Sequence, residues 1–239
     1  MRKRSAVTIV VGLVCVGAVV AVALVGGARR RERIGREVLD DIKKGLDEEF
    51  GEGPRKFVNR LDAPALSPSL KKIHVPFSFD YPKRWEITEG GKKLTRSNFV
   101  SMKWDAAPGF VGELLSVGSL VSPEGADPAA YAKEQLGVVE KEALASAYPR
   151  YKREGEETTT VDGRPAFALR FSGHVTAEES GGKEDVDIYG MLLVVPDVVG
   201  HRGLALVLIS SSMAGTKAAT EVGVTGDLGA MLKSFRLSE

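Results

Sequence analysis

The chain has 239 residues, with 33 Lys and Arg against 32 Asp and Glu and a formal net charge of +1 at pH 7. This balance argues against a nucleic-acid-binding protein, because such proteins carry a basic excess on one face. The single cysteine excludes an intramolecular disulfide and any zinc or iron–sulfur site built from several cysteines. We predict no cofactor, and a globular domain joined to an additional segment.

The first predicted element is an uncharged apolar run over residues 6–28. A helix of this length measures about 35 Å at 1.5 Å per residue, and the hydrocarbon core of a bilayer is roughly 30 Å thick. Basic residues stand at both ends of the run, where they hold a helix in register with the headgroups: Arg2, Lys3 and Arg4 before it, and Arg29, Arg30, Arg31, Arg33 and Arg36 after it. We therefore predict a transmembrane anchor over residues 1–28 that lies in the lipid bilayer.

A cleaved secretory signal is the alternative for this segment, because Ala21-Val22-Ala23 offers an exit of small residues. The length of the run and the arginines directly after it favour the uncleaved anchor. The larger number of positive charges after the run favours a cytoplasmic C-terminal side, whereas a basic start before an apolar run is typical of export. We expect a single-pass plasma-membrane protein with an extracytoplasmic C-terminal domain, and the opposite orientation stays an alternative.

Residues 29–50 follow as a predicted juxtamembrane amphipathic helix. Its apolar residues are spaced four apart and form one stripe: Ile34, Val38, Ile42, Leu46 and Phe50. We favour a stalk over a dimerisation seam, because the run is shorter than the heptad repeats of a coiled coil. Glycine and proline then break regular structure over residues 51–70, which we predict to be a linker. The globular domain is expected to cover residues 71–239.

The globular domain begins with predicted strands. Apolar and polar residues alternate over residues 73–81, which is the pattern of a half-buried strand. Residues 81–85 make a turn in which Pro82 fixes φ, and Trp85 begins a return strand. The same alternation is found at Val100, Met102 and Trp104, and again at Leu115 and Val117.

Two helices and four more strands complete the domain. Asp127-Pro128 supplies an N-cap and a first-turn proline, so a helix is predicted from there to about Ala147. Asp162-Gly163 between two strand-like runs predicts a hairpin, because both turn positions tolerate positive φ. Strands are expected over residues 186–195 and 204–211, the second in a central position, and a last helix over residues 218–233. We predict an α+β fold with a largely antiparallel sheet sandwiched by helices.

Three short motifs resemble PsbP-like domains over residues 71–237. Residues 77–85 resemble their opening strand and Pro-x-x-Trp turn, residues 160–166 their central hairpin, and residues 231–236 their closing helix with a Ser-Phe ending. The resemblance implies an α/β/α sandwich that serves mostly as a non-enzymatic binding or assembly module, in photosystem II extrinsic subunits and in exported bacterial proteins. The membrane anchor departs from the photosynthetic members, so a photosystem role is not implied. The family offers no catalytic motif.

The best candidate for a metal site is an acidic hairpin around Ser180-Gly181-Gly182. Its possible ligands are His174, Glu184, Asp185 and Asp187, with Glu178 and Glu179 nearby. A hard cation requires several carboxylate oxygens at about 2.3–2.6 Å, and the glycines would let them converge. The spacing is not that of a calcium loop, so a solvated acidic loop is the favoured interpretation. We predict no catalytic residue, because phosphate-loop, dinucleotide and nucleophile-elbow motifs are absent.

Tyr81, Trp85 and Trp104 are the candidate binding residues, which could line a ligand groove. Aromatic residues at alternating strand positions belong to a core more often than to a ligand groove. We expect a membrane-tethered, non-enzymatic binding or scaffolding domain that contacts a protein of the bacterial envelope. The alternative is a carrier of a small molecule or lipid, with a pocket between the sheet and the helices.

Overall fold

The computed structural model describes residues 53–63, 66–89, 98–107, 110–145, 148, 150–180, 184–212 and 217–237. The predicted membrane segment at residues 6–28 and the predicted helix at residues 29–50 lie outside these ranges. Among the helices of the described ranges, none has both the length and the apolar character needed to cross a bilayer. The described residues form an α+β domain.

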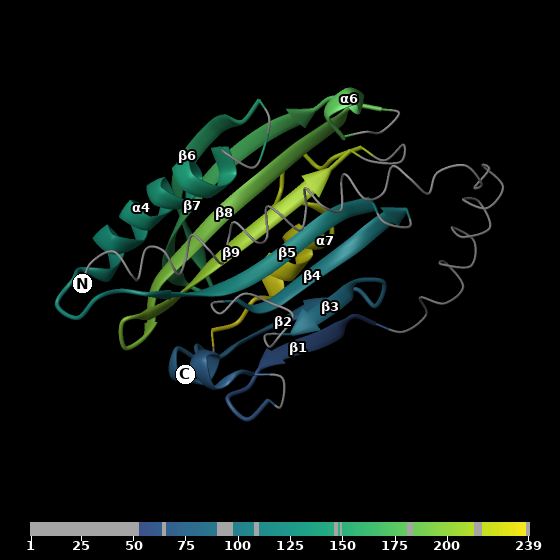
Figure 1. Ribbon diagram of the computed structural model, residues 1–239. Coiled ribbons are helices and arrows are strands. Elements are labelled where there is room, and N and C mark those ends of the chain that lie inside the picture. Colours follow the sequence, from purple (N-terminus) through teal and green to yellow (C-terminus); the bar gives the residue numbers. More distant parts are fainter. Residues whose placement is uncertain are drawn as a thin grey trace.

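Seven antiparallel strands form the main sheet, in the spatial order β3-β4-β5-β9-β8-β7-β6 (Figure 1). Their bounds in this order are Glu86–Glu89, Asn98–Ala107, Phe110–Val121, Arg202–Ser211, Val186–Val199, Arg164–Val175 and Lys152–Val161. The strand β9 lies in the middle and is buried at every position after Arg202. A strand that is covered on both faces is apolar throughout, so the predicted central position of this strand is confirmed.

The hairpin between β6 and β7 is closed by Asp162 and Gly163, whose φ angles are 49° and 76°. Val161 pairs with Arg164 across this two-residue turn. A two-residue hairpin turn whose twist matches that of its strands requires positive φ at both central positions. The predicted hairpin is therefore confirmed. The Asp162 carboxylate also accepts a hydrogen bond from the Leu237 amide at 2.8 Å, which ties the turn to the C-terminal segment.

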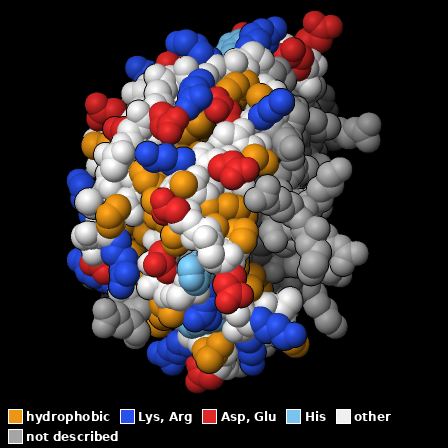
Figure 2. Space-filling view, turned by 90° about the vertical axis from the view of Figure 1, so that its left-hand side faces the viewer, with side chains coloured by type: hydrophobic (Ala, Val, Ile, Leu, Met, Phe, Trp, Pro, Cys, Tyr) orange, Lys and Arg blue, Asp and Glu red, His pale blue; other side chains and the backbone are white. Residues whose placement is uncertain are grey.

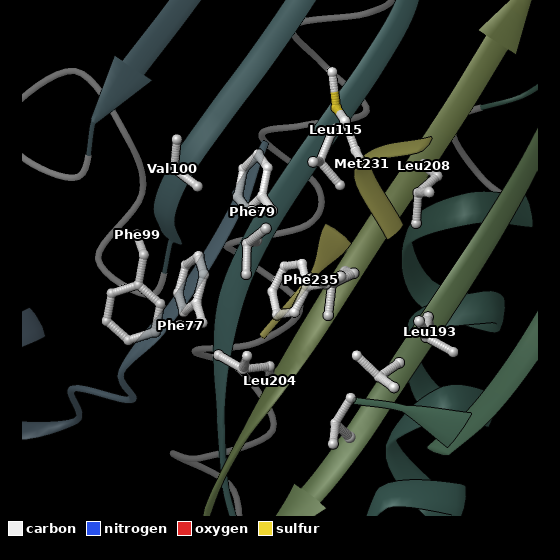
Figure 3. Close-up of a cluster of buried hydrophobic side chains, with 14 of the residues drawn as sticks. Phe77, Phe79, Phe99, Val100, Leu115, Leu193, Leu204, Leu208, Met231 and Phe235 are labelled. Carbon is white, nitrogen blue, oxygen red and sulfur yellow. The ribbon is translucent and has the colours of Figure 1, made fainter. Parts of the chain in front are cut away.

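One face of the main sheet is covered by a two-stranded sheet and by helix α7. β1 (Arg55–Asn59) pairs antiparallel with β2 (Phe77–Tyr81), and α7 spans Gly226–Ser234. The ring of Phe235 stacks on those of Phe77 and Phe79, with centroids 5.2 and 5.5 Å apart (Figure 3). All three rings are at most 1% exposed. Aromatic rings therefore fill this layer of the domain.

Helix α4 (Pro128–Val139) covers the opposite face, where it contacts β8 and β7 (Figure 1). It begins as predicted, because the Asp127 side chain accepts a hydrogen bond from the Ala129 amide at 2.9 Å. The helix continues into a π-helical turn, η2 (Glu140–Leu144). A short helix, α6 (Ala177–Ser180), follows β7. The sheet is thus sandwiched, with α7 and β1–β2 on one side and α4 on the other.

Part of the predicted linker at residues 51–70 belongs to the folded domain. Phe57 on β1 is buried, with its ring 5.7 and 5.4 Å from those of Phe77 and Phe79. Ser67 is the N-cap of helix α3 (Pro68–Lys72), and its side chain accepts a hydrogen bond from the Leu70 amide. Pro68 therefore starts a helix instead of marking a linker. The domain begins by residue 55, and the predicted start at residue 71 is wrong.

Two predicted element boundaries and one predicted strand pairing also differ from the structure. β2 begins at Phe77 and not at Ile73, because Ile73 is the C-cap of α3. β3 pairs with β4 in the main sheet and does not return along β2. α7 begins at Gly226, and not near Ala218, because Gly223 has a φ angle of 79° that a right-handed helix excludes.

Charged side chains of both signs alternate over the face drawn in Figure 2, with apolar side chains gathered between them. This distribution matches the near-zero net charge of the chain. A nucleic acid requires a continuous basic surface, and this face does not provide one. The exposed large apolar residues of the described ranges are dispersed along the chain: Val58, Leu61, Ile87 and Val224.

Candidate functional site

The turn after β2 places two of the predicted binding residues in the core. The Trp85 amide donates a hydrogen bond to the Pro82 carbonyl oxygen at 3.1 Å, which closes the turn. Tyr81 and Trp85 are 8% and 3% exposed, so their rings pack inside the domain. The indole Nε1 of Trp85 donates to Asp227 Oδ2 at 2.9 Å. The turn is therefore fixed to the first turn of α7, although 142 residues separate the two in sequence.

Arg84, in the same turn, joins Asp227 to the third predicted binding residue, Trp104. Its guanidinium group forms an ion pair with the carboxylate of Asp227. The guanidinium carbon lies 5.5 Å from the centroid of the Trp104 ring, where the negative face of the indole attracts a cation. The Arg84 and Asp227 side chains are 35% and 21% exposed, and Trp104 is half-buried. This part of the turn therefore reaches the molecular surface.

Glu113 lies beside this ion pair. It stands on β5 opposite Trp104 on β4 and Ser210 on β9. Burial, followed by the repulsion of the Asp227 carboxylate, raises the pKa of Glu113 to about 7, against the opposing effect of Arg84. A carboxyl group with such a pKa changes its charge near neutral pH. Arg84, Trp104, Glu113 and Asp227 are called the Arg84 cluster below.

A β-bulge separates Glu113 from Val111, which stands two residues earlier on β5. Trp104 pairs with Glu113 whereas Asp105 pairs with Val111, so Gly112 is the extra residue on β5. A Cβ atom at Gly112 would stand 2.9 Å from two carbon atoms of the Trp104 ring. Glycine is therefore the residue that allows this ring to lie against the strand. The bulge sends Val111 into the core beneath α4 and keeps Glu113 on the α7 side.

A polar row across the sheet continues from Glu113. Ser210, Tyr189 and Ser172 follow it on β9, β8 and β7, each opposite the next. Two residues further inward on the same face, the corresponding row is apolar on β5, β9 and β8: Leu115, Leu208 and Met191. The apolar core on the α7 side thus ends at the polar row, and the Arg84 cluster lies at this boundary.

The serines at the end of β9 are used structurally. The hydroxyl of Ser210 accepts a hydrogen bond from the Ala219 amide at 2.9 Å. The hydroxyl of Ser211 donates to the Val111 carbonyl oxygen at 2.6 Å. Both hydroxyl groups therefore join β9 to neighbouring backbone, and their contacts give no evidence of an activated nucleophile.

The predicted metal ligands lie where β7 ends and β8 begins. His174 Nδ1 is 2.8 Å from Asp187 Oδ1, and His174 Nε2 is 3.5 Å from Asp185 Oδ2. Asp185 also accepts a hydrogen bond from the Ala177 amide at 2.8 Å, and Glu184 is exposed. Among the residues that the structure describes, no three His, Cys, Asp or Glu side chains are placed to hold a metal ion. His174, Asp185 and Asp187 are called the His174 cluster below.

The sequence does not single out Arg84, Glu113 or Asp227 as site residues. Glu113 had a usable signal, since it is the one charged residue in the stretch from 110 to 121, which is otherwise free of charge. Asp227 follows Gly226 at the start of a helix, where a carboxylate is ordinary. Nothing in the sequence indicates that Asp227 contacts Arg84 and Trp85, because that contact depends on how α7 packs.

No family model matches the chain, and no curated protein matches it in sequence. Among solved structures, it is similar to cyanobacterial PsbP from Synechocystis sp. PCC 6803, with 13% identity and a TM-score of 0.45 over 78% of this chain and 93% of that one. It is also similar to LpqN, which is involved in cell envelope biogenesis of Mycobacterium tuberculosis, with 14% identity and a TM-score of 0.42 over 79% and 92% of the two chains.

A third similar structure is the Ran-binding protein Mog1p of Saccharomyces cerevisiae, with 9% identity and a TM-score of 0.43 over 77% and 95% of the two chains. A PsbP protein is thus among the solved structures that this chain is similar to. The processes and partners named here are those of the three other proteins.

Proposed function

We propose that this chain carries a non-enzymatic binding module, which residues 6–28 tether outside the plasma membrane and which contacts a protein of the cell envelope. The support for the tether is the uncharged run of membrane-spanning length between two basic ends. The support for an extracytoplasmic domain is the basic start followed by an apolar run. The support for binding is that the Arg84 cluster contains an arginine and a tryptophan, and that contacts within the domain hold these side chains in place.

The Arg84–Trp104 pair is the observation that carries this proposal. Arginine and tryptophan are the residue types that most often contribute a large share of the binding energy at protein interfaces. Here the guanidinium group lies over the indole and is held by Asp227, whose carboxylate also binds the buried Trp85. A side chain that is ordered before binding loses less conformational entropy when a partner arrives. The cluster is therefore suited to docking a protein.

The alternative of a small-molecule or lipid carrier requires a cavity between the sheet and the helices. On the α7 side, the layer is occupied by Phe77, Phe79 and Phe235, which stack on one another. On the α4 side, Phe171 stacks between Tyr148 and Tyr151, with centroids 5.8 Å apart in both pairs. This filling favours a binding surface over an internal pocket.

Photo-crosslinking in intact cells tests the proposal. A photoreactive residue in place of Ile87, which is exposed on β3 next to the turn, is expected to cross-link the full chain to an envelope protein. The matched control is the same residue at Glu156 on the opposite edge strand. The double variant Arg84→Ala/Trp104→Ala, with its fold checked by circular dichroism, is expected to abolish the cross-link from position 87.

Cross-linking of equal yield from positions 87 and 156, or a yield that the double variant leaves unchanged, would refute a contact through the Arg84 cluster. Protease added to intact spheroplasts tests the orientation separately. Digestion of the C-terminal domain is expected, and complete protection with a protease-sensitive N-terminus would place the domain in the cytoplasm.

A further inference from the structure

The sheet face opposite α7 has two halves that differ in their cover. Helix α4 contacts β8 and β7, and no other helix among the described residues has comparable contacts with β5 or β9. The β5–β9 half of this face is nevertheless shielded from solvent: Leu114, Val207 and Ile209 are at most 2% exposed. The apolar side chains of this half therefore lie beside α4 and not beneath it.

The surface of this half suits a helix. Leu114 lies opposite Ile209, Ser116 opposite Val207, and Gly118 opposite Ala205. Small residues, Gly118 and Ala205, thus lie between the large side chains of Leu114 and Leu120, so a helix could approach the strands closely there. The Ser116 hydroxyl accepts a hydrogen bond from Asn98 Nδ2 at 3.1 Å, so an apolar cover would not leave it unpaired.

The chain has a segment with the matching pattern. Residues 32–50 carry apolar residues spaced four apart, and charged residues occupy the remaining positions. One apolar stripe with a charged opposite side is typical of a helix that packs on a sheet and faces water on its other side. From Ile34 to Leu46 the stripe would extend about 18 Å at 1.5 Å per residue, comparable with the six residues from Leu114 to Leu120 at about 3.3 Å each.

We propose that residues 32–46 dock as a helix on the β5–β9 half of the sheet face, with Ile34, Val38, Ile42 and Leu46 against Leu114, Val207 and Ile209. The apolar run at residues 6–28 is a poorer occupant, because it has no polar side to turn towards water. The nine residues from Leu46 to Arg55 span up to about 30 Å when extended, which allows passage around the β3 edge of the sheet to β1 (Figure 1).

This arrangement gives the amphipathic segment a role other than that of a stalk. Only three residues separate position 28 from position 32, so a helix docked on the domain holds the domain beside the membrane. The same helix completes the cover of the sheet opposite α7. The domain and the juxtamembrane segment would then unfold as one unit.

Thiol labelling of the full chain in lipid nanodiscs tests the proposal. The native thiol is removed with Cys15→Ser, and Val207→Cys places a new one on the β5–β9 half. Ile42→Asp in the stripe is expected to raise the maleimide labelling rate at position 207 by about tenfold, because undocking exposes the buried thiol. The matched control Lys43→Asp introduces the same side chain beside the stripe and is expected to leave the rate unchanged.

A second thiol position separates undocking from general unfolding. Ala168→Cys lies in the buried core on the α7 side, and its labelling is expected to stay slow in the Ile42→Asp chain. An unchanged rate at position 207, or an equal rise at positions 168 and 207, would overturn the proposal.

Cross-linking identifies the occupant. In the Cys15→Ser chain, Val38→Cys and Val207→Cys are expected to be joined within one molecule by a bismaleimide of about 10 Å, the usual separation of packed layers. A link between two molecules that disappears on dilution would assign this face to a second copy of the chain and would overturn the proposal. Absence of any link between these positions would do the same.

Discussion

Two polar clusters lie on the sheet, and they differ in how they are held. The Arg84 cluster joins a turn, two strands and a helix, and its central carboxylate binds a buried indole. The His174 cluster joins β7 to the start of β8 through adjacent positions of one hairpin, and the side chains of Asp185 and Asp187 are more than half exposed. The first depends on the tertiary fold, whereas the second needs only local pairing.

The difference shows why a group of acidic residues in sequence is a weak indicator of a site. Carboxylates that follow one another in a hairpin remain in water, where each is well solvated and a charge partner contributes little. Carboxylates from distant segments meet only where packing removes water, and there a neighbouring charge shifts the pKa. Glu113, which lies beside Asp227, is of this second kind. Variants in the two clusters should therefore have unequal effects.

Trp85→Ala should have the largest effect of these variants. It removes a buried ring and the donor to Asp227, so we expect the free energy of unfolding to fall by about 3–5 kcal/mol. Urea unfolding followed by circular dichroism measures this change. Trp85→Phe keeps most of the volume and loses only the hydrogen bond, so it should cost much less. Equal losses for both variants would show that the hydrogen bond, and not packing, holds the turn.

Asp227→Ala should come next. It leaves the Arg84 guanidinium and the Trp85 Nε1 without their shared acceptor, and we expect a loss of about 1–3 kcal/mol. Asp227→Asn keeps an oxygen acceptor for the indole and removes the charge, so its loss should be smaller. The measurement is the same urea transition. Arg84→Ala is the complementary control, and a double variant that shows strict additivity would contradict a coupled cluster.

Glu113→Gln should change how stability depends on pH. Because burial raises the pKa of Glu113 to about 7 in the folded state, this carboxyl stabilises the fold most below its unfolded pKa. That contribution is lost as pH rises through 7. Relative to the native chain, the glutamine variant should gain about 1 kcal/mol between pH 4 and pH 8, after allowance for solvent screening. Thermal unfolding across this range measures the difference, and parallel curves would exclude the raised pKa.

Most of the main sheet could be predicted because its signals are local. The turn at Asp162-Gly163 and the apolar run of β9 each require a particular backbone or burial that few other sequences satisfy. The helix cap at Asp127 is of the same kind. The prediction of a linker over residues 51–70 was wrong because β1 has only five residues and pairs with a strand that follows α3. β1 can be recognised as a strand only from its pairing with β2, and the periodicity of its own five residues does not reveal that pairing.

The candidate site could be predicted only in part. Trp104 and the 81–85 turn were singled out from the sequence, and the structure brings Trp85, Arg84 and Trp104 together through Asp227 and β4. Asp227 lies more than 140 residues further along the chain, and only the packing of α7 places it there. The bulge at Gly112 is a second cause, because one extra residue puts Val111 on the face opposite to that of Glu113.

His174→Asn should have the smallest effect and sharpens the contrast between the two clusters. The variant removes the contacts with Asp185 and Asp187, but these side chains are largely solvated. We expect the free energy of unfolding to change by no more than about 0.5 kcal/mol, with little dependence on added salt. Urea unfolding at low and high ionic strength measures it. A loss comparable to that of Asp227→Ala would mean that the His174 cluster is coupled to the core, and exposure would then be a poor guide to which carboxylates this fold depends on.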